Sequence, residues 1–182
     1  MATMILLPDS TGASSAAWVA VNEATRHECL DDDNDDTSYV KCSVDSKSMI
    51  IEFADPDDVT SANSGVAEAD IASIDSVRFL SSGKSIHRTD PSRVEIGFVT
   101  PSGNSAEVVA YDAHRTDYET INGTARTTYD GTHAWTYARL EGMQMTCVKI
   151  QTVEVYLSYL AMEVTYTAAV SADNATFFGA NF

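Results

Sequence analysis

Residues 153–166 read VEVYLSYLAMEVTY and form the longest β-favouring run of the chain. If the run is a strand, both of its faces are largely apolar or aromatic. One carries Val153, Val155, Leu157, Tyr159 and Ala161, and the other carries Tyr156, Leu160, Met162, Val164 and Tyr166. A strand of this kind is covered on both sides, by a second sheet or by a neighbouring subunit. We therefore predict that it is the central strand, or a strand pair, of a β-sandwich.

Shorter β-favouring segments precede this run and are separated by turn signals. Residues 94–99 alternate, the Pro-Ser-Gly-Asn sequence of 101–104 turns the chain, and residues 107–111 return, which predicts a hairpin. Asn122-Gly123 supplies the positive φ angles of a type I′ turn, so we predict a second hairpin over 118–129. Ser82-Gly83 also reads as a turn.

The fold class follows from the number and spacing of these segments. Eight to ten short strands with turn signals, no repeat and no βαβ alternation predict an all-β protein. We expect an antiparallel, jelly-roll-like β-sandwich over residues 16–168. Residues 1–15 are expected to form an extended N-terminal arm, and residues 169–182 a C-terminal aromatic tail.

The composition is strongly acidic. The chain of 182 residues has 27 Asp and Glu against 11 Lys and Arg, a formal net charge of −16. This balance argues against nucleic-acid binding, which needs a basic surface, and against docking on anionic lipid. Many carboxylates with few lysines suit high salt, where repulsion is screened, so we expect a halophilic source; an ordinary acidic exterior is the alternative.

The conspicuous polar cluster is the run Asp31–Asp36. The spacing of Asp31, Asp33 and Asp35 imitates the start of a Ca²⁺-binding loop, but Asp36 stands where that pattern requires glycine. A cation site here and a solvated acidic loop both remain open; otherwise we expect no cofactor.

Cysteine and histidine spacing gives little support to a reactive site. Cys29, Cys42 and Cys147 are expected to be small buried side chains, although one disulfide to Cys42 is possible by count. No zinc-type histidine spacing and no nucleophile-elbow motif occurs. We expect a protein that is not an enzyme. Asn122 and Asn174 match the glycosylation pattern, but Asn122 is also explained by its turn.

The apolar ends and the tryptophans are the candidate contact residues. Partner contacts are predicted for Ile5, Leu6, Leu7, Phe177, Phe178 and Phe182. Trp18 and Trp135 could stack on sugars, but packing in the core is the use that we favour for both.

The order of these features resembles a group of β-sandwich structural proteins of tailed bacteriophages and archaeal tailed viruses. The similarity rests on AVNEA (20–24), DDDNDDTSYV (31–40), HAWTYARLEGMQ (133–144) and MEVTY (162–166), within residues 18–166. It implies a virion structural protein without catalytic residues, either a capsid decoration (cement) protein or a tail or fibre component.

From this resemblance we expect a capsid decoration protein on the outside of the virion. It would be a homotrimer that contacts the major capsid protein through its two arms and binds neither nucleic acid nor membrane. The alternative is a tail or fibre component that binds a glycan or receptor, with Trp18 and Trp135 as stacking residues.

Overall fold

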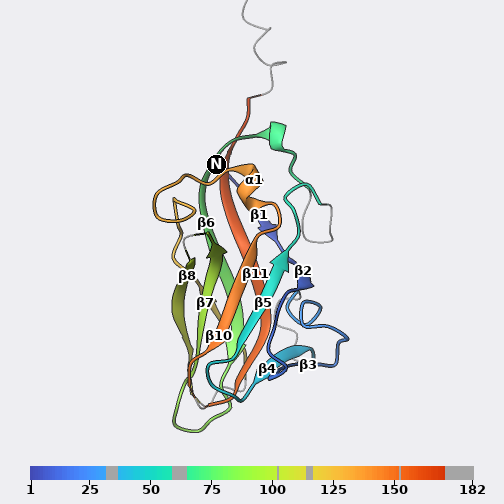
Figure 1. Ribbon diagram of the computed structural model, residues 1–182, viewed down its shortest axis with the longest axis vertical. Coiled ribbons are helices and arrows are strands. Elements are labelled where there is room, and N and C mark those ends of the chain that lie inside the picture. The colour runs from blue at the N-terminus through green and yellow to red at the C-terminus, as the bar shows by residue number, and fades with distance from the viewer. Residues whose placement is uncertain (32–36, 59–64, 102, 114–116, 152, 171–182) are drawn as a thin grey trace, which may run out of the picture.

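The computed structural model describes residues 1–31, 37–58, 65–101, 103–113, 117–151 and 153–170, without the side chains of 103–105. They form two antiparallel sheets packed face to face (Figure 1). Sheet A contains β3 (Trp18–Val21), β4 (Tyr39–Cys42), β11 (Val155–Ala168), β6 (Ile71–Lys84) and β9 (Glu119–Asn122), with β1 (Ala2–Leu6) also paired to β11. Sheet B contains β2 (Pro8–Thr11), β5 (Ser48–Phe53), β10 (Gln144–Lys149), β7 (Ser92–Thr100) and β8 (Gly103–Tyr111). The predicted jelly-roll-like β-sandwich is confirmed.

Strand β11 is the central strand of sheet A, as predicted. It pairs with β6 along one side, and with β4 and then β1 along the other. Its inner face packs into the core with fully buried side chains: Val155, Leu157, Leu160, Met162 and Val164. The outer face is only half-buried at Tyr156, Tyr159 and Glu163. Sheet B covers the inner face alone, so the outer face lacks the cover that the sequence predicts for both faces.

A β-bulge in β11 changes which side chains share a face. Leu157 is opposite Gly83, and Tyr159 is opposite the next residue, Ser82, so Ser158 is the extra residue. The alternation of the sequence places Tyr156 and Tyr159 on opposite faces. Because the bulge shifts the register by one residue, both tyrosines point outward.

Two glycines that were predicted to lie in turns lie instead against aromatic rings. Gly83 lies inside β6, where an added Cβ would stand 2.6 Å from the Tyr111 ring. At Gly123 it would stand 2.4 Å from the Phe79 ring. Both predicted turns are therefore wrong, because each glycine is needed for close approach to an aromatic ring.

The second predicted hairpin, over residues 118–129, is also wrong. Beyond β9 the chain continues beside β6 and does not fold back on itself, because Val77 and Arg126 exchange two backbone hydrogen bonds. The hairpin of β7 and β8 is confirmed. Two short helices complete the described elements: η1 (Glu68–Asp70) and α1 (Tyr137–Leu140).

The segment predicted to be an extended N-terminal arm contributes one strand to each sheet. Residues 2–6 pair with β11, and residues 8–11 pair with β5 in the other sheet. Leu6 and Leu7 lie in the core and Ile5 is half-buried, so these apolar side chains are used within the fold. Phe177, Phe178 and Phe182, with most of the predicted tail, lie outside the described residues.

The three cysteines are buried and free, in line with the interpretation of small apolar side chains. Burial raises the pKa of the Cys147 thiol to about 12, which keeps it protonated. Within the described part of the chain, no helix has the length and apolar character needed to cross a membrane.

Candidate binding face

A row of side chains crosses the outer face of sheet A at right angles to the strands. Val19 is the cross-strand partner of Lys41, Lys41 of Tyr156, and Tyr156 of Lys84. The Lys84 ammonium lies 4.2 Å from the centroid of the Tyr118 ring, just before β9. The row thus reaches from one edge of the sheet to the other, and at about 4.8 Å per strand it spans roughly 19 Å.

Two further tyrosines adjoin this row. The rings of Tyr39 and Tyr156 have centroids 5.4 Å apart and are tilted by 55°. Tyr159, brought to the face by the bulge, is the next outward side chain of β11 beyond Tyr156. All are half-buried, so each residue keeps part of its surface in contact with solvent. In the following text the "tyrosine face" means Tyr39, Tyr118, Tyr156 and Tyr159 with Lys41 and Lys84.

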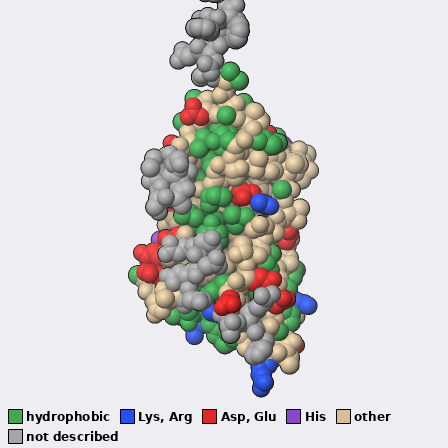
Figure 2. Space-filling model, turned by 180° about the vertical axis from the view of Figure 1, so that it is seen from behind, with side chains coloured by type: hydrophobic (Ala, Val, Ile, Leu, Met, Phe, Trp, Pro, Cys, Tyr) green, Lys and Arg blue, Asp and Glu red, His purple; other side chains and the backbone are tan. Residues whose placement is uncertain are grey.

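Polar contacts hold these rings in place. The Tyr156 hydroxyl donates to Glu154 Oε2 at 2.9 Å, and Glu154 Oε1 lies 3.9 Å from the Lys41 ammonium. Burial, together with the neighbouring Glu154 carboxylate, raises the pKa of Tyr156 to about 12. Further along β11, Arg78 donates to Glu163 at 2.6 Å. Figure 2 shows hydrophobic side chains, tyrosines included, with charged groups among them on this side of the molecule.

A hollow with a mixed polar and apolar lining adjoins the row at the edge strand β3. Its volume is about 560 Å³, and its lining includes Val19, the last member of the row. Small apolar residues and Trp18 form part of the lining, and hydroxyl and charged side chains form the rest: Thr11, Ser14, Glu23, Thr25 and Arg26. Arg26 is fixed there by donating to the carbonyl oxygens of Trp18 and Ser15. A long ligand lying along the row would therefore meet aromatic rings first and hydrogen-bonding groups at its end.

The predicted stacking residues Trp18 and Trp135 are not at a surface. They are 0% and 3% exposed. Their indole N–H groups donate to the carbonyl oxygens of Lys47 and Arg126, each at 2.9 Å. The stacking role is thus wrong for both, and the interpretation as core residues is correct. The tyrosine face was missed because the alternation rule separates Tyr156 from Tyr159.

The predicted cation site is only partly within the described residues. Asp31 is half-buried, whereas Asp33 and Asp35 lie outside them. Among the described side chains, no group of three or more His, Cys, Asp or Glu could hold a metal ion. Asn122 is exposed at the end of β9, and Asn174 lies outside the described chain. Glycosylation stays a prediction.

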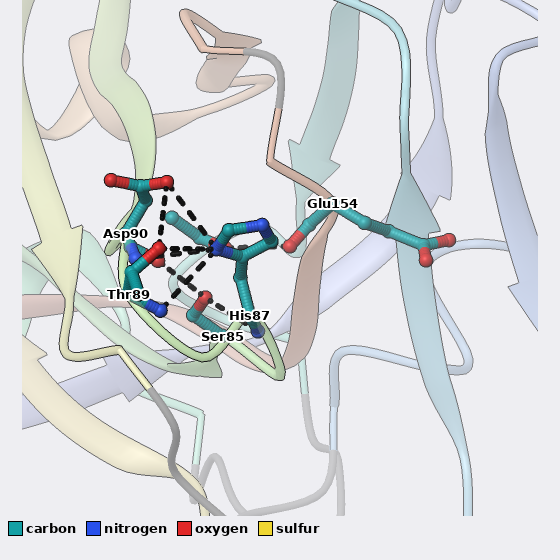
Figure 3. Close-up of polar contacts among 6 residues, drawn as sticks. Ser85, His87, Thr89, Asp90 and Glu154 are labelled. Atoms are coloured by element: carbon teal, nitrogen blue, oxygen red, sulfur yellow. Dashed lines mark hydrogen bonds and ion pairs between the residues drawn. The ribbon is translucent and has the colours of Figure 1, made fainter.

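A Ser-His-Asp grouping does occur in the connection between β6 and β7, but its geometry is that of a loop brace (Figure 3). His87 Nδ1 accepts hydrogen bonds from the backbone N–H groups of Thr89 and Asp90, at 3.4 and 3.2 Å. Ser85 Oγ donates to the Asp90 carbonyl at 3.1 Å and does not contact the imidazole nitrogens. A nucleophile needs a hydrogen bond to the base, so this arrangement does not match a catalytic triad.

No protein-family model and no curated protein matches the chain. Solved structures with partial similarity include three carbohydrate-binding modules. The family 11 module from Clostridium thermocellum, in complex with a mixed-linked tetrasaccharide, is 9% identical, with 87% of this chain and 95% of that chain covered and a TM-score of 0.42. The CBM22-1 xylan-binding domain from Paenibacillus barcinonensis is 10% identical (89% and 98% covered, TM-score 0.41). A family 16 carbohydrate-binding module is 12% identical (80% and 84% covered, TM-score 0.38). Similarity at this level does not indicate what this chain binds.

Proposed function

We propose that this protein is a glycan-binding module that holds a sugar chain across the tyrosine face. The observation that supports the proposal is the cross-strand row from Val19 to Tyr118, which joins aromatic rings to polar groups over the whole width of sheet A. Tyrosine presents an apolar ring and a hydrogen-bonding hydroxyl, and a sugar ring likewise has apolar C–H faces and polar edges. The two surfaces are therefore complementary.

The charge of the molecule favours a neutral glycan. A net charge of −16 repels polyanions at low salt. Two cationic groups on the face are already paired, Lys41 with Glu154 and Arg78 with Glu163, so they are better suited to orient polar side chains than to neutralise a ligand. A glycan-binding component was the alternative expected from the sequence, with two tryptophans as the stacking residues. The proposal keeps this function and assigns the stacking to tyrosines.

Binding of a panel of neutral soluble polysaccharides, measured by calorimetry and by retardation in polysaccharide-containing gels, tests the proposal. Tyr156→Ala should weaken binding by about tenfold or more, since an aromatic contact contributes about 0.5–1.5 kcal/mol beyond area burial. Tyr156→Phe keeps the ring and should bind nearly as well. Val108→Ala, on the outer face of sheet B, is the control. Absence of binding across the panel, or equal binding by Tyr156→Ala, would overturn the proposal.

The capsid decoration role stays a prediction. Its expected N-terminal contact residues Leu6 and Leu7 are buried in the fold, and the aromatic residues of the tail are outside the described chain. The homotrimer, the virion location and the halophilic source likewise stay predictions.

A further inference from the structure

Strand β8 forms one edge of sheet B, at the left of the sandwich in Figure 1. It pairs with β7 over residues 103–111 without a shift, and no other described strand lies on its second side. With nine residues it is longer than the other strands at the ends of the two sheets, β2, β3 and β9, which have four residues each. A long open edge attracts other strands through its unpaired backbone groups.

The hydrogen bonds of the neighbouring strands show which backbone groups of β8 point outward. Ile150 N donates to the Arg93 carbonyl, so the backbone groups of Arg93 point towards β10. Arg93 is opposite Ala110, and this pair therefore exchanges no hydrogen bonds. The N–H and C=O groups of Ala110, and by alternation those of Ala106 and Val108, point away from β7. Within the described residues, no backbone hydrogen bond from another segment reaches them.

The features that protect other edges of the sandwich are absent from β8. On β3, Arg26 donates to the Trp18 carbonyl at 2.7 Å, and β2 begins with Pro8, which has no N–H. β8 contains no proline, lysine or arginine. Its one charged residue, Glu107, points towards sheet A and accepts a hydrogen bond from Arg126 at 3.1 Å. The edge is therefore open to a further strand.

The charge at this edge suits a second copy of the same acidic protein. Two molecules that each carry a net charge of −16 repel one another in most orientations. The charged side chains of β7 and β8 are Arg93, Glu95 and Glu107, and Arg126 is bound to Glu107. The two positive and two negative charges cancel. Two copies can therefore approach through this edge with little repulsion.

The strand is also complementary to itself in the antiparallel direction. When Val108 lies opposite Val108 of the second copy, Ala106 lies opposite Ala110 of that copy. All three have outward backbone groups, so these pairs exchange about six hydrogen bonds. Their side chains are small and lie on the outer face of the sheet, where Val108 is 60% exposed. No bulky or charged side chain has to be displaced.

The neighbouring registers are less favourable than the one centred on Val108. In that register Glu107 lies opposite Val109 of the second copy, so like charges do not meet. A register centred on Glu107 places two carboxylates directly opposite each other. A register centred on Val109 needs the backbone N–H of Asp112, which already donates to Glu119 Oε2 at 3.1 Å. The register centred on Val108 avoids both costs.

We propose that two copies of this protein pair through β8 in antiparallel orientation, with Val108 at the two-fold axis. The five-stranded sheets B of the two molecules then form one continuous sheet. Because the same edge is used on both molecules, the contact closes at a dimer. The tyrosine face lies on sheet A and stays open on both copies. This contact is independent of the proposed glycan binding.

Sedimentation equilibrium of the full chain, at up to about 1 mM protein in about 0.15 M and about 1 M salt, tests the proposal. The mass should rise from that of the monomer to that of the dimer and no further. Val108→Pro removes an outward N–H that the pairing with β7 does not use, and it should stay monomeric. Val19→Lys, at a 47% exposed valine of the edge strand β3, should dimerise like the wild type.

Two charged variants test the register. Val108→Lys and Val108→Glu each place like charges opposite one another at the axis, and each should raise the dissociation constant of the dimer by about fivefold or more. An equimolar mixture of the two places a lysine opposite a glutamate and should recover dimers. A mixture that associates no better than either variant alone overturns the proposal.

Hydrogen exchange locates the contact. The amides of Ala106, Val108 and Ala110 should exchange more slowly as the dimer forms, whereas those of β3 should not change. A wild type that stays monomeric at both salt concentrations overturns the proposal, as does growth beyond a dimer or association without slower exchange on β8. Slow exchange of these three amides in a monomer also overturns it, because another part of the same chain then covers the edge.

Discussion

The outer face of sheet A carries Tyr39, Tyr156 and Tyr159, whereas the outer face of sheet B carries Ile50, Thr146 and Val148 at comparable central positions. Both sheets bury the same kind of aliphatic inner face. Part of the difference is composition, because regular alternation already places Tyr39 and Tyr156 outward. The rest is register. β10 pairs with both of its neighbours without a shift, so strict alternation is kept, while the bulge at Ser158 in β11 turns Tyr159 outward as well. A one-residue irregularity thus adds a further aromatic ring to the face.

The largest expected effect comes from an ion pair that joins the two sheets. Lys149 of β10 is fully buried, and its ammonium lies 2.6 Å from Asp45 Oδ1 in the connection from β4. Asp45→Ala leaves a buried cation unpaired and should lower the free energy of unfolding by about 3 kcal/mol, measured by urea denaturation. The double variant Asp45→Ala with Lys149→Met should recover most of this loss. Equal stability of Asp45→Ala and wild type would show that water replaces the carboxylate.

A comparison of two glycines tests how tightly each sheet is packed. Gly83→Ala, on the inner side of sheet A, forces the Tyr111 ring and Leu157 apart and should cost about 2 kcal/mol. Gly12→Ala, at the outer face of sheet B, would place its Cβ 3.0 Å from Ile50 Cγ2 and 3.3 Å from Ile50 Cβ, a looser contact than at Gly83, and should cost about 1 kcal/mol or less. Urea midpoints of the two variants provide the measurement, and similar losses would contradict the difference in packing.

The ionisation of Tyr156 distinguishes the tyrosine face at high pH. Its folded pKa is raised to about 12, so above pH 10 an unfolded tyrosine loses its proton while the folded one keeps it. Stability therefore falls as pH rises from 10 towards 12, by about 1 kcal/mol at pH 11 from this residue. Tyr156→Phe should show a shallower decline than wild type between pH 9 and 11. Parallel curves would mean that Tyr156 titrates like an unfolded tyrosine.

The smallest expected effect concerns the polar pairs of the two faces. A double-mutant cycle with Arg78→Met and Glu163→Gln should give a coupling energy of about 0.5 kcal/mol, because both groups are partly solvated. The corresponding cycle for Glu52 and Gln144 on sheet B, whose side chains are 2.7 Å apart, should give no more. A coupling above about 2 kcal/mol on sheet A would make the pair a structural requirement of that face.

Several site assignments could not be made from the sequence. Trp18 and Trp135 are the rarest aromatic residues of the chain and drew attention as stacking residues, yet both are buried with satisfied indole groups. Leu6 and Leu7 looked like an arm because Pro8 follows them, but Pro8 opens β2 at a sheet edge, where its missing N–H is tolerated. Neither the burial of the two tryptophans nor the pairing of the N-terminal strands can be recognised from the neighbouring residues in the sequence.

The sequence by itself determined the all-β class, the central strand, predicted at 153–166 and found at 155–168, and the hairpin of β7 and β8. These features depend on local alternation and on turn residues, which act over a few neighbours along the chain. The tertiary structure alone decided the outward position of Tyr159, the ring contacts of Gly83 and Gly123, and the burial of Lys149. Each depends on a partner strand or loop distant in sequence. The side chain that a strand residue presents is fixed only when its register with that partner is fixed.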